Sequence, residues 1–306
     1  MQKKKRGPMI VVTIVVIAVA VLLTIAALIK YSPKPLETSN KIGVISIRGP
    51  ITLGGNGASG GLPFQENIDS GTIISFIESA SADKNIKAII LNINSPGGTV
   101  VASKEIVDAV KKVDKPVVAL IREVGASGAY WIASAADLIV ADPLSVTGSV
   151  GVAGGYLEFS DLISEYGVEY HSLKTGRYKD LGNPFVDLSP EGRGLLQKKL
   201  DIIHEYFVDD VSKNRGKDLK AYGNGLFYLG KEAKEIGLID ELGGKDEAVM
   251  FVKELAGIKE HELVFYRPKA SLFDVLSKLS SNIGFSVGQG IGSQFLIEES
   301  YGFKLE

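Results

Sequence analysis

The longest apolar run of the chain lies near its start, from Met9 to Ile29, and is interrupted only by Thr13 and Thr24. At about 1.5 Å per residue, a helix over this run is about 31 Å long, which matches the hydrocarbon core of a bilayer. A cleaved signal has a shorter apolar region of roughly 7–15 residues, although Ala18-Val19-Ala20 keeps cleavage open as an alternative. We therefore expect an uncleaved transmembrane anchor at 9–29.

Of the basic residues that flank this apolar run, most lie before it. The tip, residues 1–8, carries Lys3-Lys4-Lys5-Arg6, whereas Lys30 and Lys34 follow the run more sparsely. The positive-inside rule then places the N-terminus in the cytoplasm and the remaining chain outside a cell membrane that it crosses once. Residues 30–40 contain two prolines and are expected to form a short, stiff linker.

From Lys41 onward, short continuous apolar runs alternate with segments of helical periodicity. The expected strands are 41–48, 88–93, 116–121, 138–140 and 168–173. The expected helices are 67–81, 100–113, a helix starting near 127, 195–214 and 231–236. Continuous apolar strands that alternate with helices predict an α/β fold with a parallel sheet covered on both faces. We expect one domain at 41–265, a glycine-rich loop at 54–61, and an amphipathic or flexible tail at 266–306.

Composition narrows the function. The net charge of the 306 residues is −2, and the part that follows the basic tip is more acidic still, which argues against nucleic acid as a partner. There are no cysteines, and none of the three histidines forms a metal-binding pair with another. We therefore expect neither a metal site nor a cofactor.

One serine has a setting that suits a nucleophile. Ser127 lies in Gly125-Ala126-Ser127-Gly128-Ala129, after an apolar run and before a predicted helix. Small neighbours allow a tight turn and a close approach of substrate, although the α/β-hydrolase pattern fails because Ala129 replaces its last glycine. Taken alone, the stretch is explained as well by close packing of a helix on a sheet.

Two further stretches could serve that serine. Asn94-Ser95-Pro96-Gly97-Gly98 follows a predicted strand, so the amides of Gly97 and Gly98 could form an oxyanion hole, or the stretch could be a plain turn. Lys179, in Thr175-Gly176-Arg177-Tyr178-Lys179-Asp180, could act as general base if burial lowered its pKa by about 3 units. A solvated surface lysine is the alternative.

Thr147-Gly148-Ser149-Val150-Gly151 offers a hydroxyl, that of Ser149, to orient a lysine amine. The adjoining strand, at Gly151 and Val152, would bind the substrate backbone. A histidine base is the competing interpretation, with His171 and an acid such as Asp187 completing a Ser-His-Asp triad. His204 lies on the apolar side of a predicted helix and is expected to be a core residue.

Together these four stretches, with Phe227 to Gly244, resemble the signal peptide peptidase A family of serine proteases (S49), in its single-repeat, membrane-anchored form. The resemblance covers about 41–265. It implies a ClpP/crotonase-type fold, Ser127 as nucleophile, Lys179 as general base and Ser149 as the serine that orients the lysine. Gly97 or Gly98 should supply the oxyanion amide.

The resemblance also implies a homo-oligomer that cleaves apolar peptides, such as remnant signal peptides, beside the bilayer. A related NfeD-type peptidase that acts on stomatin-like proteins, a crotonase-like acyl-CoA enzyme and a non-catalytic scaffold are the alternatives. An anchored, outward-facing domain argues against the acyl-CoA enzyme, because CoA is cytoplasmic. The tail, with Phe285, Phe295 and Leu296, could contact another subunit or the membrane, or be a self-substrate.

Overall fold

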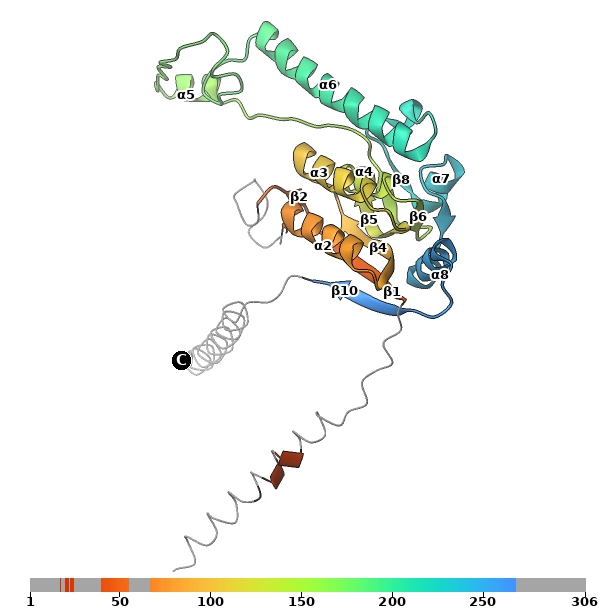
Figure 1. Cartoon of the computed structure of the whole chain (residues 1–306). Coiled ribbons are helices and arrows are strands. Elements are labelled where there is room, and N and C mark those ends of the chain that lie inside the picture. The colour runs from red at the N-terminus through yellow and green to blue at the C-terminus, as the bar shows by residue number, and fades with distance from the viewer. Residues whose placement is uncertain (1–16, 18–19, 22, 25–39, 55–66, 268–306) are drawn as a thin grey trace, which may run out of the picture. The chain divides into compact units, whose positions relative to one another are not determined.

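The computed structural model describes residues 17, 20–21, 23–24, 40–54 and 67–267 (Figure 1). The chain divides into two compact units, Met1–Ser39 and Asn40–Glu306. In the first unit the described residues are helical, and Thr24 Oγ1 donates to the carbonyl oxygens of Ala20 (3.0 Å) and Val21 (2.8 Å). A helix long and apolar enough to cross a membrane is not found among the described residues. Most of the predicted anchor, most of the glycine-rich loop and the tail from 268 lie outside them.

The described part of the second unit is built on an eight-stranded sheet in which β10, β1, β4, β5, β6 and β9 are neighbours in that order. All of these pairs are parallel, whereas β7 pairs with β5 in parallel and with β8 antiparallel. The strands are β1 (Lys41–Arg48), β4 (Ile86–Ser95), β5 (Val117–Ala126), β6 (Leu138–Ala141), β7 (Val146–Gly148), β8 (Phe227–Leu229), β9 (Glu241–Leu242) and β10 (Glu262–Tyr266). Two short strands, β2 (Ile51–Thr52) and β3 (Ile68–Asp69), form a separate pair.

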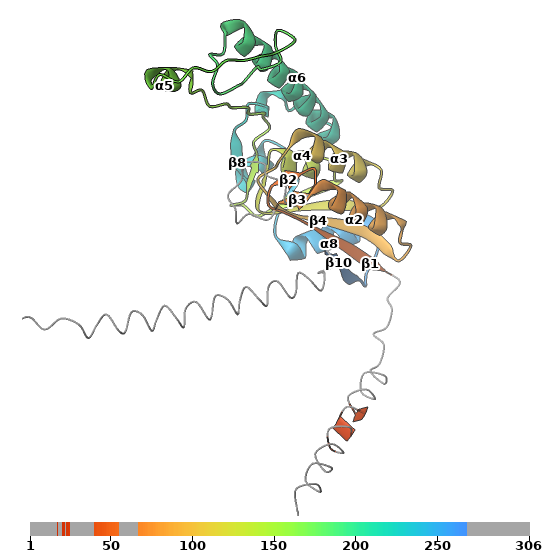
Figure 2. The same cartoon turned by 90° about the vertical axis from the view of Figure 1, so that its left-hand side faces the viewer.

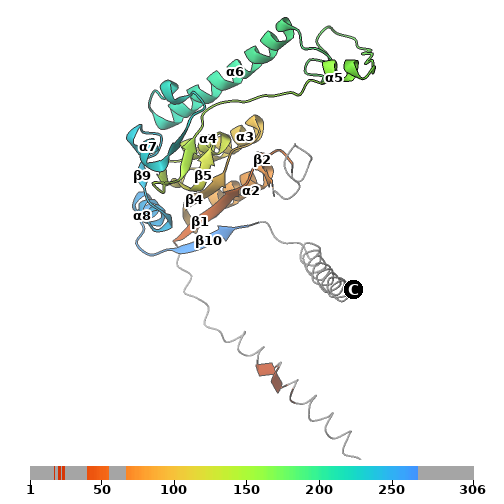
Figure 3. The same ribbon diagram turned by 180° about the vertical axis from the view of Figure 1, so that it is seen from behind.

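Helices cover both faces of this sheet. The helices of the described chain are α2 (Ser70–Ala82), α3 (Val100–Lys111), α4 (Gly128–Ser134), α5 (Ser160–Glu165), α6 (Pro190–Arg215), the 3-10 turn η1 (Lys220–Tyr222), α7 (Gly230–Glu235) and α8 (Lys245–Ala256). The larger core lies where α2, α3 and α4 pack on one face, and a smaller core lies under α8 on the other (Figures 1 and 3).

Strand β4 shows why the apolar runs are continuous. Ile89, Leu91 and Ile93 belong to the larger core, while Ala88 and Ile90 face α8. Successive side chains of a strand point to opposite faces, so a strand buried on both sides needs apolar residues at every position.

The helix ends follow from local chemistry. Asp69 caps α2, because its carboxylate accepts from the amide of Thr72 at 2.9 Å. Ser189 caps α6 in the same way, accepting from Gly192 at 3.1 Å with Pro190 in the first turn, and Gly216 ends the helix at φ 60°.

The predicted fold class is confirmed, but one predicted strand is wrong. Residues 168–173 form no strand, and their apolar side chains are exposed, with Leu173 at 99%. They belong to a segment that we call the arm, residues 156–189, which contains α5 and lies at the end of α6 remote from α7 (Figures 1–3). The strand expected at Gly151 and Val152 is likewise unpaired chain. Sequence reasoning did not predict α8 or β10.

Candidate active site

Ser127 lies at the sharp connection between β5 and α4. Its backbone has φ 55° and ψ −126°, and its amide donates to the carbonyl of Gly148 at 2.8 Å. Among the described residues, Ser127 and Ser149 (φ 51°) are the non-glycine residues with positive φ. Such conformations are costly and are retained mainly where function requires a side chain in an unusual position.

The small residues beside Ser127 are required by the close packing of the surrounding chain, and not only by the approach of a substrate. A Cβ on Gly128 would lie 2.2 Å from Ser103 Oγ, and a Cβ on Gly125 would lie 2.8 Å from Ile121 Cγ2. Ala129 is fully buried in the larger core. The packing interpretation of this stretch is therefore confirmed, and the same tight packing creates the turn that carries Ser127.

The geometry separates the two candidate oxyanion glycines. The amide of Gly97 donates to Ser95 Oγ at 3.1 Å, so it is already engaged. The amides of Gly98 and Gly128 donate to no acceptor within the part of the chain that the structure describes. Gly98 N also lies 3.4 Å from the position that a Cβ on Gly128 would occupy, so both amides lie near Ser127. Gly97 instead leaves space for the Ser127 side chain, because a Cβ added at position 97 would lie only 2.9 Å from Ser127 Cβ.

Two clefts meet at Ser127. The first, which we call the apolar cleft, has a volume of about 600 Å³. Its described walls are mostly hydrophobic and carry no charged side chain; they include Ile51, Val100, Trp131, Val152, Ile203 and Phe207. Trp131 stacks on Phe207 at 4.6 Å between ring centroids, so α4 and α6 together form one wall.

The second, which we call the polar cleft, has a volume of about 390 Å³ and contains both Ser127 and Ser149. Its far wall comes from α6, with Gln197, Asp201 and His204. Gly151, Val152 and Ala153 line both clefts. The structure thus brings Ser127, Ser149, Gly98, Gly151 and Val152 together around one site.

Lys179 is not brought to this site within one chain. It lies in the arm as an exposed residue and lines neither cleft. The preceding residue, Tyr178, donates its hydroxyl to Glu191 at 2.6 Å, at the start of α6. Ile203 of the apolar cleft follows Glu191 by 12 residues, which corresponds to about 18 Å along the helix. A lysine side chain is far too short to cross that distance.

The histidines also lie away from the nucleophile or are engaged otherwise. His171 is an exposed arm residue whose ring lies 3.2 Å from Glu169, and Asp187 is exposed as well. The structure therefore does not assemble a Ser-His-Asp triad with His171. His204 is half-buried, with Nε2 2.5 Å from the carbonyl oxygen of Gly223, and it lines the polar cleft rather than the core.

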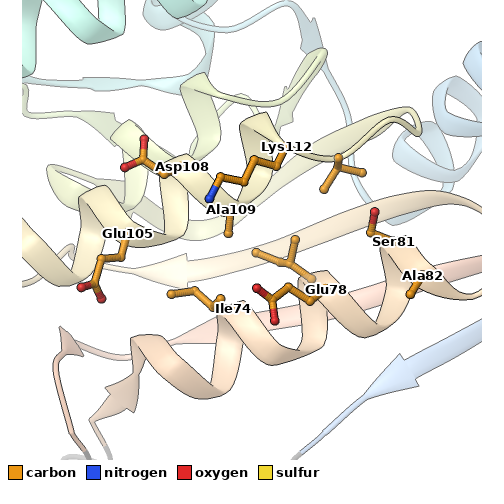
Figure 4. Close-up of a pocket in the computed structure, with 10 residues that line it drawn as sticks. Ile74, Glu78, Ser81, Ala82, Glu105, Asp108, Ala109 and Lys112 are labelled. Atoms are coloured by element: carbon orange, nitrogen blue, oxygen red, sulfur yellow. The ribbon is translucent and has the colours of Figure 1, made fainter.

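A further cleft, of about 500 Å³, lies between α2 and α3, and Figure 4 shows its side chains. Glu78 projects from α2, and Glu105, Asp108 and Lys112 project from α3. None of its lining residues is shared with the clefts at Ser127. Its one serine among the described lining residues, Ser81, lies on α2 without the positive φ of Ser127.

Comparison with known proteins identifies the family. The model of peptidase family S49 matches residues 109–259, and the Clp protease model matches residues 65–140. A Methanocaldococcus jannaschii protein named "Putative protease MJ0651" is 32% identical over 235 residues, which cover 74% of each chain. The chain belongs to peptidase family S49.

Other S49 relatives differ in length. Protease 4 of Salmonella typhi is 33% identical over 253 residues, which span 80% of this chain but only 40% of that protein. An Enterococcus faecium protein named "Putative signal peptide peptidase SppA" is 29% identical over 236 residues, covering 75% of this chain and 68% of the relative. These matches identify the chain as a serine protease with a Clp-protease-like fold.

In this S49 peptidase, sequence reasoning missed three contributors to the site. The Gly128 amide was not singled out, although a residue that follows a nucleophile at a strand-to-helix turn is a natural donor. The wall formed by Ile203 and Phe207 was not predicted, because helical spacing of apolar residues does not distinguish a core from a cleft wall. Asp201 carried no signal in the sequence.

Proposed function

We propose that this S49 peptidase is a membrane-anchored serine endopeptidase that hydrolyses apolar peptides, such as remnant signal peptides, with Ser127 as nucleophile and Lys179 as general base. The observation that carries the proposal is the placement of Ser127. A strained turn holds it beside two amides without intramolecular acceptors and at the mouth of an uncharged, largely apolar cleft.

The chemistry follows from these groups. The neutral amine of Lys179 removes the proton of Ser127 Oγ, which attacks the scissile carbonyl. The Gly98 and Gly128 amides stabilise the oxyanion of the tetrahedral intermediate. The protonated amine then donates to the leaving nitrogen, and water hydrolyses the acyl-enzyme by the same route. The Ser149 hydroxyl, in the same cleft as Ser127, orients the amine.

Lys179 in this proposal comes from a neighbouring copy of the chain. Within one chain it lies at the start of α6, while no lysine is among the described residues that line the clefts at Ser127. The arm that carries it exposes an unusual amount of apolar surface, including Leu157, Tyr166 and Leu173 at 71%, 77% and 99%. Surfaces of this kind typically form protein interfaces. A homo-oligomer would cover the arm and complete the site.

The substrate class follows from the apolar cleft and from the chain that borders it. A cleft without charged walls accepts an apolar side chain, and Gly151 to Ala153, which pair with no strand, can bind an extended peptide backbone. The name of the Enterococcus faecium relative refers to signal peptides. Remnant signal peptides are apolar and lie in the bilayer, so an anchored enzyme would meet them there.

Complementation between inactive variants tests both the dyad and its origin. Ser127→Ala and Lys179→Ala should each abolish hydrolysis of an apolar fluorogenic peptide. When the two variants are dissociated, mixed in equal amounts and reassembled, activity should return to about a quarter of the wild-type rate, because a quarter of the sites combine both intact residues. Mixtures that stay inactive would argue for a lysine in cis, and an active Lys179→Ala variant would exclude the dyad.

The anchor is tested separately. We expect the full-length chain to remain in the membrane fraction after a carbonate wash, with residues 1–29 still present by mass spectrometry, because the run at 9–29 is long enough to span. Externally added protease should digest the domain from 41 onward in spheroplasts. A mature N-terminus near Ala20 would show that the run is a cleaved signal.

A further inference from the structure

We propose that the polar cleft is a second substrate subsite, selective for a cationic side chain, with Asp201 as its specificity-determining residue. The proposal deepens the proposed peptidase function and rests on it. Substrates would then carry an apolar residue for the apolar cleft and a lysine or arginine for the polar cleft.

Of the residues that the structure describes, Asp201 is the one acidic or basic residue, other than His204, that lines either cleft at Ser127. It forms no ion pair with any described residue. Two other carboxylates of α6 are already engaged, since Asp209 pairs with Lys220 at 3.1 Å and Asp210 with Lys111 at 2.7 Å. Asp201 is therefore left with capacity to bind a cation from outside the chain.

Neighbouring side chains orient this carboxylate. Gln197 Nε2 donates to Asp201 Oδ1 at 2.7 Å, one helical turn earlier on α6. His204 Nε2 lies 2.5 Å from the carbonyl oxygen of Gly223, and this contact holds the imidazole against the loop at Gly223. The other lining residues, among them Leu200, Val152 and Ala153, are neutral and could contact the aliphatic stem of a lysine while its ammonium group reaches Asp201.

The relation between the two clefts predicts how the two substrate residues are spaced. Gly151, Val152 and Ala153 form a boundary that both clefts share. Successive side chains of a peptide bound in extended form along this boundary would point to opposite sides. The positions of the apolar and the cationic residue in the peptide should therefore differ by one or three. They should not differ by two, because side chains two positions apart point to the same side.

Peptide profiling with the full-length enzyme tests this selectivity. A fluorogenic library keeps one apolar residue at the cleavage site and places lysine, glutamine or glutamate at each flanking position. We expect wild-type kcat/KM to favour lysine over glutamine on the order of fivefold at one position, as for a partly exposed ion pair. Asp201→Asn should remove that preference, and Asp201→Lys should transfer it to glutamate. Glu205→Gln, one turn further along α6 and outside both clefts, is the matched control and should keep the wild-type profile.

Two outcomes would overturn the proposal. One is a wild-type profile that is indifferent to charge at every position. The other is an Asp201→Asn enzyme that loses kcat equally for all peptides while the acid limb of its pH–rate profile moves to lower pH. That pattern would mean that Asp201 pairs with the catalytic lysine, because a carboxylate partner raises a lysine pKa and its removal lowers it. Failure of the proposed function itself is distinguishable, since Ser127→Ala would then leave hydrolysis intact.

Discussion

Ser127 and Ser149 both have a positive φ, which glycine adopts without strain and other residues rarely do. At Ser127 the positive φ occurs at the turn between β5 and α4, which carries the proposed nucleophile. At Ser149 the amide donates to Leu226 at 2.9 Å, which fixes the turn and directs the side chain toward the polar cleft. Two strained serines in one cleft are the reason for the hypothesis that each hydroxyl has a function.

A glycine at position 149 separates conformation from chemistry. Ser149→Gly removes the hydroxyl and relieves the positive φ, while a freer unfolded chain offsets the gain, so the free energy of unfolding should change by less than about 1 kcal/mol. The kcat should fall on the order of 100-fold, because the lysine amine loses its orienting partner. Urea denaturation and steady-state kinetics measure the two quantities. Unchanged kcat would remove Ser149 from the mechanism.

At the scale of elements, α6 contributes most to the site beyond Ser127 itself. It supplies Ile203 and Phe207 to the apolar cleft, and its Asp210 fixes it to α3 and α4. The Asp210 carboxylate accepts from Trp131 Nε1 at 2.8 Å and from Lys111 Nζ at 2.7 Å. Partial burial acts to raise the pKa of Asp210, but these hydrogen bonds and the positive charge of Lys111 outweigh it and lower the pKa overall.

Asp210→Asn should therefore destabilise the protein in a pH-dependent way. The folded-state pKa is lowered, so the stabilisation is present above the unfolded value of about 4 and is lost as pH falls through the folded value. We expect a loss of about 1 kcal/mol at pH 7, allowing for partial exposure, and a difference from wild type that shrinks in acid. Fluorescence of Trp131, the single tryptophan, reports unfolding in urea. Asp209→Asn, whose ion pair is exposed, should behave as wild type; an equal loss there would contradict the assignment.

At the scale of the whole molecule, the arm has aromatic contacts of its own and yet leaves much apolar surface uncovered. Tyr170 and Phe185 lie 5.7 Å apart, and Asn183 Nδ2 donates to the Tyr170 hydroxyl at 2.9 Å. Despite this internal order, Leu173 is almost fully exposed. A structured segment with an apolar outer face is typical of an interface.

Assembly should therefore depend on the outer face of the arm. Leu173→Asp places a charge on that face, so we expect light scattering to show a smaller species and peptidase activity to fall by on the order of tenfold or more. Leu144→Asp is the matched control, because Leu144 is 75% exposed but lies outside the arm, between β6 and β7. If Leu173→Asp keeps the wild-type mass and activity, the arm is not the interface.

Much of the fold was predictable because burial leaves a local pattern. A strand covered on both faces must be apolar at every position, and the runs at 41–48 and 116–121 have this character. The strand expected at 168–173 failed for a related reason. Apolar residues also occur where a surface meets another molecule, and sequence pattern does not distinguish the two environments.

The sequence by itself determined the family, the parallel α/β fold and the cluster of small residues around Ser127, because these depend on local spacing and burial. Only the tertiary structure decided which glycine amide is available, since a contact of Gly97 with Ser95 leaves Gly98 as the donor. It also placed Lys179 on the exposed arm, outside both clefts at Ser127. Contacts between distant segments decide both points, and such contacts leave no periodicity in the chain.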